Sequence, residues 1–191
     1  MASLIVGLGN PGGEYARTRH NIGWMCLDEL ESRGRFGRSR REGPARVREG
    51  AVDGYEMVTA RPQTYMNASG RAATHLLRRY GVAIEDVVVV HDEVDLPLGR
   101  IRLKCGGGAA GNKGVLSIAD ALRSQDFMRV RVGVSRPAER DQMVDYVLDG
   151  FSPEERGRLV RVLPRAADAV IALVRDGLET AMSEYNRAPD D

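Results

Sequence analysis

A histidine and an aspartate, His20 and Asp92, occupy the positions in this sequence that are best suited to catalysis. His20 lies in a polar loop after one predicted strand and Asp92 follows another, so both are expected at the carboxyl edge of a sheet. A carboxylate beside a histidine fixes one ring tautomer and makes the ring a better base, as the activation of water near neutral pH requires. His75 lies within a predicted helix and His91 ends a buried strand, so neither predicts a base. The pair predicts that His20 is a general base supported by Asp92. The simpler alternative is that His20 is a loop histidine without a partner.

Two asparagines, Asn10 and Asn67, add to this pattern. Both lie in turn or cap positions, where backbone capping is the simplest role. Each side chain can also offer an amide N–H to a carbonyl or a developing oxyanion. No side-chain nucleophile is evident, because the chain has no G-x-S-x-G and Cys26 falls on the apolar pattern of a helix. We therefore expect a hydrolase that attacks an ester directly with water, on a substrate that is rich in phosphate.

Two glycine-rich loops, Gly7–Gly12 and Gly106–Gly111, match G-x-G-x-x-G and raise a nucleotide-binding alternative. A dinucleotide loop runs directly into a helix that receives the pyrophosphate. Pro11 disfavours this in the first loop, because it pushes Asn10 out of the helical region. The second loop is not a P-loop, because Asn112 stands where a P-loop has a glycine directly before its lysine, here Lys113. Its glycines still allow backbone N–H groups to approach a phosphate or a sugar.

Charged residues cluster in two places. Asp92, Glu93 and Asp95 are a possible Mg²⁺ site beside a phosphate, although such clusters also arise as ordinary loop polarity. The segment 33–48 contains seven arginines against Glu42 alone, a local charge of +6 in a chain of net charge +1. This segment predicts either a phosphate-binding surface or a solvated loop.

Strands that alternate with helices predict the framework that positions these groups. Asp53-Gly54 favours a hairpin, because that pair tolerates positive φ at the turn. The expected fold is α/β: a mixed, mostly parallel twisted sheet with helices on both faces. Its site is expected to be built by the loops 9–20 and 92–98 and by the glycine loop after Cys105. Strands are predicted over 3–8, 45–50, 55–60, 86–90 and 128–134, and helices over 20–33, 69–80, 111–123 and 152–176, the last with a kink or break before Pro164.

Length and composition indicate the class of protein. The 191 residues, 42% hydrophobic and 29% charged, predict a single globular domain over 1–191. No apolar run approaches the about 18 residues that cross a bilayer, and the start of the chain lacks a signal-peptide pattern. Two cysteines make neither a disulfide framework nor a metal site. We therefore expect a cytoplasmic protein with no membrane contact.

Three ordered blocks of residues resemble the bacterial peptidyl-tRNA hydrolases, and the match covers nearly the whole chain. Each block alone is weakly specific, and the three together, at matching separations, are highly specific. They are Gly7-Leu8-Gly9-Asn10-Pro11-Gly12 with Tyr15 and Thr18-Arg19-His20-Asn21-Ile22-Gly23, then Pro62-Gln63-Thr64-Tyr65-Met66-Asn67-Ala68-Ser69-Gly70, and His91-Asp92-Glu93-Val94-Asp95-Leu96-Pro97-Leu98-Gly99.

The resemblance implies hydrolysis of the ester between a peptide and the 3′ ribose of tRNA, which recycles peptidyl-tRNA. His20 matches the family's base for the attacking water, and Asp92 matches the aspartate that sustains its basicity. Asn10 matches a residue that helps to distinguish N-blocked from free aminoacyl groups. No metal or organic cofactor is implied, and we expect a monomer.

The resemblance also implies which residues bind substrate. Lys104 and Arg131 match basic positions that contact the phosphate end of the tRNA. A further set matches positions that line the channel for the peptide and the terminal adenosine, with Asn67 able to orient water or stabilise the oxyanion. These are Tyr15, Tyr65, Met66 and Asn67.

One block departs from the family's pattern. Where the family usually has Gly-Gly-His-Asn-Gly, this chain has Ala110-Gly111-Asn112-Lys113-Gly114. Lys113 stands at the usual substrate-binding asparagine, and Asn112 is one residue earlier. Either Asn112 takes over through a local backbone shift, which we favour, or Lys113 contributes a phosphate contact instead.

A non-catalytic RNA-binding protein on the same fold is the main alternative, since such relatives include splicing factors in plant organelles. The altered glycine loop is the one feature in its favour. The retained His20 and Asp92, and the absence of a transit-like extension, favour the enzyme.

Overall fold

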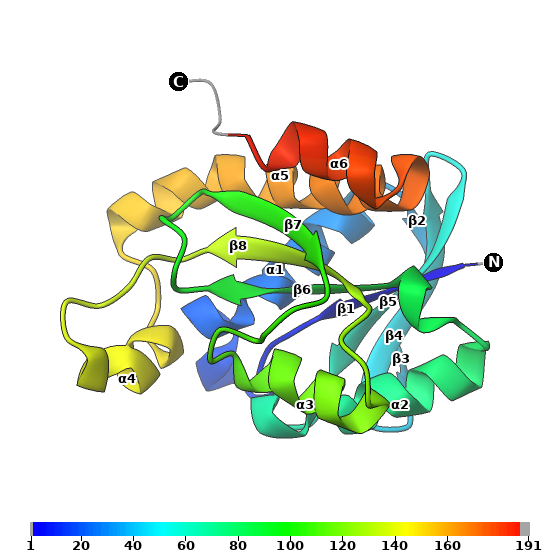
Figure 1. Ribbon diagram of the computed structural model, residues 1–191, viewed down its shortest axis with the longest axis horizontal. Helices are drawn as coiled ribbons and strands as arrows, with labels where there is room; N and C mark the ends of the chain where they lie inside the picture. Colours follow the sequence, from blue (N-terminus) through cyan, green and yellow to red (C-terminus); the bar gives the residue numbers. More distant parts are fainter. Residues whose placement is uncertain (1, 188–191) are drawn as a thin grey trace.

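An eight-stranded sheet with helices on both faces forms the framework of the protein (Figure 1). The computed structural model describes residues 2–187, so Met1 and residues 188–191 of the expected domain lie outside the described part. The strands are β1 (Ser3–Gly7), β2 (Arg35–Phe36), β3 (Arg40–Glu42), β4 (Ala45–Val52), β5 (Tyr55–Pro62), β6 (Val87–Glu93), β7 (Ile101–Cys105) and β8 (Met128–Gly133). The α-helices are α1 (Ile22–Ser32), α2 (Ser69–Tyr80), α3 (Lys113–Leu122), α4 (Met143–Leu148), α5 (Pro153–Asp176) and α6 (Leu178–Tyr185).

Parallel pairing is confined to the centre of the sheet. The strand order is β2-β4-β5-β1-β6-β8-β7, with β3 paired to β4. β1 is parallel to β5 and β6, and β6 is parallel to β8, whereas the outer pairs are antiparallel. The expected α/β fold with a mixed sheet is confirmed. The loops that follow β1, β5 and β6 meet at one edge, because the carboxyl ends of parallel strands lie together.

Two apolar cores lie on the two faces of this sheet. Helices α1, α5 and α6 cover one face, and α2 and α3 cover the other (Figure 1). Within β6, Val88 and Val90 belong to the first core, and Val87 and Val89 to the second. Asp92 continues the row of Val88 and Val90, because side chains alternate along a strand. That row faces α1, so the strand register places Asp92 beside the turn that begins α1.

The hairpin and most of the helices agree with the sequence prediction. β4 and β5 pair through Val52 and Tyr55, with Asp53 and Gly54 at φ of 52° and 86° in the turn. α2 ends at Tyr80 and is capped by Gly81, which has a φ of 63°. Turn chemistry and apolar periodicity therefore located these elements to within a few residues.

The long helix α5 runs without interruption through Pro164, so the predicted break is wrong. A proline inside a helix removes one hydrogen bond and costs about 3 kcal/mol. Val162 and Ala166 are buried on either side of it, and the Pro164 carbonyl accepts a 3.0 Å hydrogen bond from Arg33 Nη2. Tertiary packing along the 24 residues outweighs the local defect. None of the helices within residues 2–187 has the length and apolar character to cross a membrane.

The glycine loop after β7 reaches the site by an unexpected route. β7 is antiparallel to β8, so its last residue, Cys105, pairs with Met128 at the start of β8. The loop therefore leaves from the end of the sheet where the parallel strands begin, opposite the carboxyl edge, and runs back to Asn112. The buried Arg129 guanidinium holds it on the way by donating hydrogen bonds to the carbonyls of Gly106–Gly108.

We expect Gly23→Ala to destabilise the fold. Gly23 lies where α1 crosses β1 and β6, and a Cβ there would stand 2.4 Å from the carbonyl oxygen of Val90 and 2.6 Å from the amide nitrogen of Leu8. Backbone atoms cannot move aside as a side chain can, so overpacking should cost about 1–3 kcal/mol or more. Thermal unfolding would show a lower Tm.

The matched control is Gly157→Ala on α5, where a new Cβ meets nothing within 4 Å. That change should raise the free energy of unfolding by up to about 1 kcal/mol, because alanine is the better helix former. Equal melting temperatures for the two variants would contradict the close approach at Gly23.

Candidate active site

A cavity of about 570 Å³ opens at the carboxyl edge of the central strands. Of the predicted site residues, nine line it: Asn10, Tyr15, His20, Tyr65, Met66, Asn67, Asp92, Asn112 and Lys113. The other two, Lys104 on β7 and Arg131 on β8, do not line it, and of these Arg131 contacts the cavity residue Glu93. The remaining wall comes from Glu93, Val94, Ala110 and Gly111 and from a segment that the sequence did not assign to the site, which contributes Arg136, Arg140, Met143, Val144, Val147 and Leu148.

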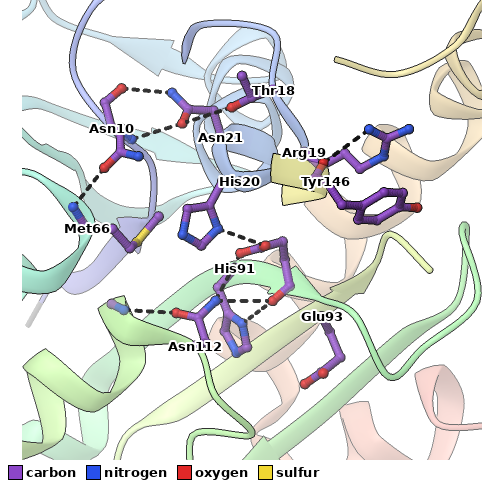
Figure 2. A network of polar contacts seen from close by, with 12 residues as sticks. Asn10, Thr18, Arg19, His20, Asn21, Met66, His91, Glu93, Asn112 and Tyr146 are labelled. Carbon is purple, nitrogen blue, oxygen red and sulfur yellow. Dashed lines mark hydrogen bonds and ion pairs between the residues drawn. The ribbon is translucent and has the colours of Figure 1, made fainter. Parts of the chain in front are cut away.

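His20 and Asp92 form the central contact of this cavity, and the dashed line from the His20 ring in Figure 2 marks it. His20 lies in a single 3₁₀ turn, η2 (Arg19–Asn21), with its Nδ1 atom 2.8 Å from Asp92 Oδ2. Their side chains are 12% and 2% exposed. A carboxylate only accepts hydrogen bonds, so Nδ1 carries the hydrogen and Nε2 carries the lone pair. Nε2 has no partner among the described residues, which leaves it available to accept a proton.

Asn21 ties the loop of Asn10 to the turn that carries His20. The fully buried Asn21 side chain accepts a hydrogen bond from the Asn10 amide and donates one to the Asn10 carbonyl, both at 2.9 Å. Sequence reasoning did not give Asn21 a role. Its position directly after His20 in a polar stretch was the only available signal, because the partner lies 11 residues earlier in the chain.

Asn10 in turn contacts the other side of the cavity. Its Oδ1 accepts a 2.7 Å hydrogen bond from the amide of Met66, at the start of the 3₁₀ turn η3 (Met66–Ala68). This contact fixes the orientation of the Asn10 side chain at the cavity wall. Its Nδ2 group makes no hydrogen bond to any other residue that the structure describes. Asn67, the next residue, is exposed at the same wall. Two asparagine side chains, those of Asn10 and Asn67, thus line the same cavity as His20.

Arg19 connects η2, the turn that carries His20, to α4 and α5 (Figure 2). Its guanidinium lies 4.1 Å from the centre of the Tyr146 ring, donates to the Tyr146 carbonyl, and pairs with Glu155 at 2.8 Å. The amide of Arg19 also donates to the carbonyl of Asp149. The C-terminal end of α4 is therefore attached directly beside His20. These contacts join residues more than 100 positions apart, so no local pattern indicated them.

Asn112 and Lys113 begin α3, and they use their side chains differently. Asn112 Oδ1 accepts hydrogen bonds from the amides of Gly114 and Val115, and its Nδ2 donates to Asp92 Oδ1 at 2.9 Å. Both ends of this amide are therefore occupied within the protein. Lys113 is exposed and lines the cavity beside Asn112.

A group of basic side chains lies on one face of β7 and β8, and its member Arg131 pairs with the cavity residue Glu93. The strand register pairs Arg102 with Arg131 and Lys104 with Arg129. Arg131 is held by the buried Glu93, with Nη2 to Oε2 at 2.9 Å. Burial, and then the charges of Arg129 and Arg131, lower the pKa of Lys104. This face is suited to a phosphate, because a bound anion relieves the repulsion between the cations.

The three carboxylates considered for Mg²⁺ have three different partners. Asp92 contacts His20, Glu93 pairs with Arg131, and Asp95 pairs with Arg136. Within residues 2–187, no three histidine, cysteine or carboxylate side chains gather in a way that could hold a metal ion. The acidic run therefore serves to position neighbouring side chains.

The arginine-rich segment lies at the far edge of the sheet, over β2, β3 and β4. Three of its arginines pair with carboxylates: Arg33 with Glu29 and Asp168, Arg40 with Glu42 and Glu49, and Arg48 with Glu31. The other four have no carboxylate within ion-pair distance in the described structure, and they are Arg35, Arg38, Arg41 and Arg46. None of the seven lines the cavity.

Comparison with known proteins points to one family. The family model described as peptidyl-tRNA hydrolase matches residues 4–191. The peptidyl-tRNA hydrolase of Geotalea daltonii is 47% identical over 183 residues, which cover 96% of this chain and 95% of that protein. That of Mycobacterium sp. strain KMS is 48% identical, with 94% of each chain covered. The crystal structure of peptidyl-tRNA hydrolase from Acinetobacter baumannii superposes with a TM-score of 0.90 at 33% identity, over 97% of this chain and 94% of that one.

Proposed function

Since the chain belongs to the peptidyl-tRNA hydrolase family, it is an enzyme that hydrolyses peptidyl-tRNA, and we propose that His20 activates the attacking water with the support of Asp92. The bond cleaved is the ester between an N-blocked aminoacyl or peptidyl group and the 3′ ribose of the tRNA. The observation that carries this mechanism is the 2.8 Å contact of His20 Nδ1 with Asp92 Oδ2, which directs the lone pair of Nε2 to the cavity.

The proposed reaction has two steps. Water bonds to the ester carbon while His20 Nε2 takes its proton, and the carbonyl electron pair moves onto oxygen. Asp92 stabilises the imidazolium that forms. The C–O bond to the ribose then breaks, and Nε2 returns the proton to the 3′ oxygen. The amide groups of Asn10 and Asn67 are suited to donate hydrogen bonds to the oxyanion or the adjacent peptide bond.

The substrate is proposed to lie between the two walls of the cavity. Tyr15, Tyr65 and Met66 provide contact surface for the peptide and the terminal adenosine on one side. The apolar side chains of α4 provide it on the other side. Lys113 adds a positive charge at the start of α3, where a phosphate of the acceptor end can approach. No cofactor enters this mechanism, and we propose that the whole chain acts as one hydrolase domain, as a cytoplasmic monomer.

The test is the release of N-acetyl-aminoacyl groups from tRNA, with and without EDTA, beside a tRNA that carries a free aminoacyl group. We expect cleavage of the blocked substrate only, at a rate that is indifferent to EDTA. Binding of tRNA without cleavage would overturn the proposal and favour the non-catalytic RNA-binding alternative. A loss of activity in EDTA would contradict the metal-free mechanism.

We expect Lys104→Ala to raise KM several-fold with little change in kcat, because Lys104 is proposed to contact a tRNA phosphate. The plot of log affinity against log salt concentration has a negative slope, and in the variant the magnitude of this slope should decrease by about 1. The lowered pKa of Lys104 means that its positive charge is lost at a lower pH than in an ordinary lysine. The KM of the parent enzyme should therefore rise as the pH increases into the alkaline range, and the variant should lack this rise.

Arg35→Ala is the matched control, because it removes one exposed positive charge from β2, at the far edge of the sheet. It should leave KM and the salt slope close to those of the parent. Equal effects of the two variants would show that Lys104 contributes only to the net charge.

A further inference from the structure

The Asp92 carboxylate has two side-chain partners, and the second is Asn112 (Figure 2). Oδ2 contacts His20 Nδ1 at 2.8 Å, and Oδ1 accepts a 2.9 Å hydrogen bond from Asn112 Nδ2. Asn112 Nδ2 also approaches the Asp92 carbonyl oxygen at 3.3 Å. Because the Asp92 side chain is only 2% exposed, these contacts largely decide its orientation.

The orientation of the Asn112 amide is itself determined by helix α3. Asn112 is the N-cap, and its Oδ1 accepts hydrogen bonds from the Gly114 and Val115 amides at 3.0 and 3.1 Å. Two backbone N–H groups can be satisfied only by the oxygen of the side chain. The nitrogen must therefore point the other way, and it meets Asp92. A flipped amide would place two N–H donors against N–H donors and oxygen against carboxylate.

The first turn of α3 is held firmly against the rest of the cavity wall. Gly114 is buried, and an added Cβ would lie 2.5 Å from Met66 Sδ. Further along the helix, Ser117 Oγ accepts a 2.9 Å hydrogen bond from the Gly70 amide of α2. The capping residue is therefore attached to the same turn, η3, whose backbone fixes Asn10. Asp92 is thus oriented by an element on the substrate side of the cavity.

Given the proposed function, we infer that Asn112 is a positioning residue that orients the Asp92 carboxylate toward His20. Its amide is neutral, so it holds Oδ1 without cancelling the negative charge that stabilises the imidazolium. A cation in the same place would weaken that stabilisation. Asn112 therefore affects the chemical step through Asp92 and makes no contribution to substrate binding. This role differs from the substrate contact expected for it from the sequence.

The first test is Asn112→Ser, because serine is also a good N-cap. The hydroxyl can accept from the helix amides but is too short to replace the amide donor to Asp92. We expect kcat for N-acetyl-aminoacyl-tRNA to fall about 10- to 100-fold, as with other outer partners of a functional group. KM and Tm should stay close to the parental values. A parental kcat would overturn the inference, and a raised KM with unchanged kcat would show a substrate contact instead.

The second test repeats this change in an Asp92→Asn background. In Asp92→Asn, the Asn112 amide should hold the oxygen of the new side chain, so that its NH2 group faces His20. Asn112→Ser would release that constraint, and we expect no further loss of kcat in the double variant. A further loss as large as in the parent would show that Asn112 acts independently of Asp92, because independent effects add.

Ser117→Ala is the matched control, since it loosens the contact of α3 with α2 without touching Asp92. It should lower Tm while leaving kcat unchanged. A fall in kcat equal to that of Asn112→Ser would mean that any loosening of α3 suffices and would overturn the specific role. Failure of the parent enzyme to cleave the blocked substrate would instead reject the proposed function, so the two failures are distinguishable.

Discussion

His20→Ala is expected to lower kcat for N-acetyl-aminoacyl-tRNA by about 10²- to 10⁴-fold, the usual contribution of a general base. In the described structure, His20 is the only histidine that lines the cavity, with Nδ1 held by a carboxylate and Nε2 available, and the variant lacks this ring. KM should change little, because the imidazole makes few of the contacts that bind the tRNA. Single-turnover rates and a separate tRNA-binding measurement would divide the effect between kcat and binding.

The control for this prediction is His75→Ala on α2. His75 is 40% exposed and approaches Glu42 at 3.3 Å, so its replacement removes a histidine and its contact with a carboxylate away from the cavity. Its kcat should equal that of the parent. Near-parental activity of His20→Ala would show that another group activates the water. Loss of tRNA binding together with activity would indicate a misfolded variant, which thermal unfolding would reveal.

Asp92→Asn should be nearly as damaging, with a loss of about 10²- to 10⁴-fold in kcat. The side chain keeps its size, so the loss comes from hydrogen-bond direction. Asn112 donates to the position of Oδ1 and holds the new oxygen there. The new NH2 group then donates to His20 Nδ1, which places the ring hydrogen on Nε2. That nitrogen can no longer take a proton from water.

Asp95→Asn provides the same chemical change three residues further along the chain. Asp95 pairs with Arg136 and is 38% exposed, so its replacement should leave kcat within about twofold of the parent, as for most surface substitutions. A mild effect at Asp92, similar to that at Asp95, would show that His20 does not depend on a carboxylate for its tautomer.

The contacts of the site form a closed frame around the cavity. Asn21 joins the loop of Asn10 to the turn of His20, and Asn10 joins η3 through the Met66 amide. Asp92 joins His20 to Asn112 and hence to α3. On the proposed mechanism, this frame holds His20 and Asp92 in place before substrate arrives, so little reorganisation is needed during the reaction.

The sequence by itself predicted the central strands, several of the helices and the side chains that meet at the cavity. Apolar alternation and turn residues located β1, the β4–β5 hairpin, α2 and β6. Because parallel strands share an edge, the order of elements was enough to predict that Asn10, His20 and Asp92 lie together, and they line one cavity. These signals are local or follow from topology, so they are readable without coordinates.

Only the tertiary structure decided how those groups are held. The direction of β7, and so the route of the glycine loop, depends on its pairing with β8. The roles of Arg19 and Asn112 depend on partners that are distant in the sequence, Glu155 and Asp92. Strand register and helix packing create such contacts, and neither leaves a periodic signal in the residues themselves. For the same reason the continuity of α5 through Pro164 was missed, since burial on both sides of the proline outweighs its local preference.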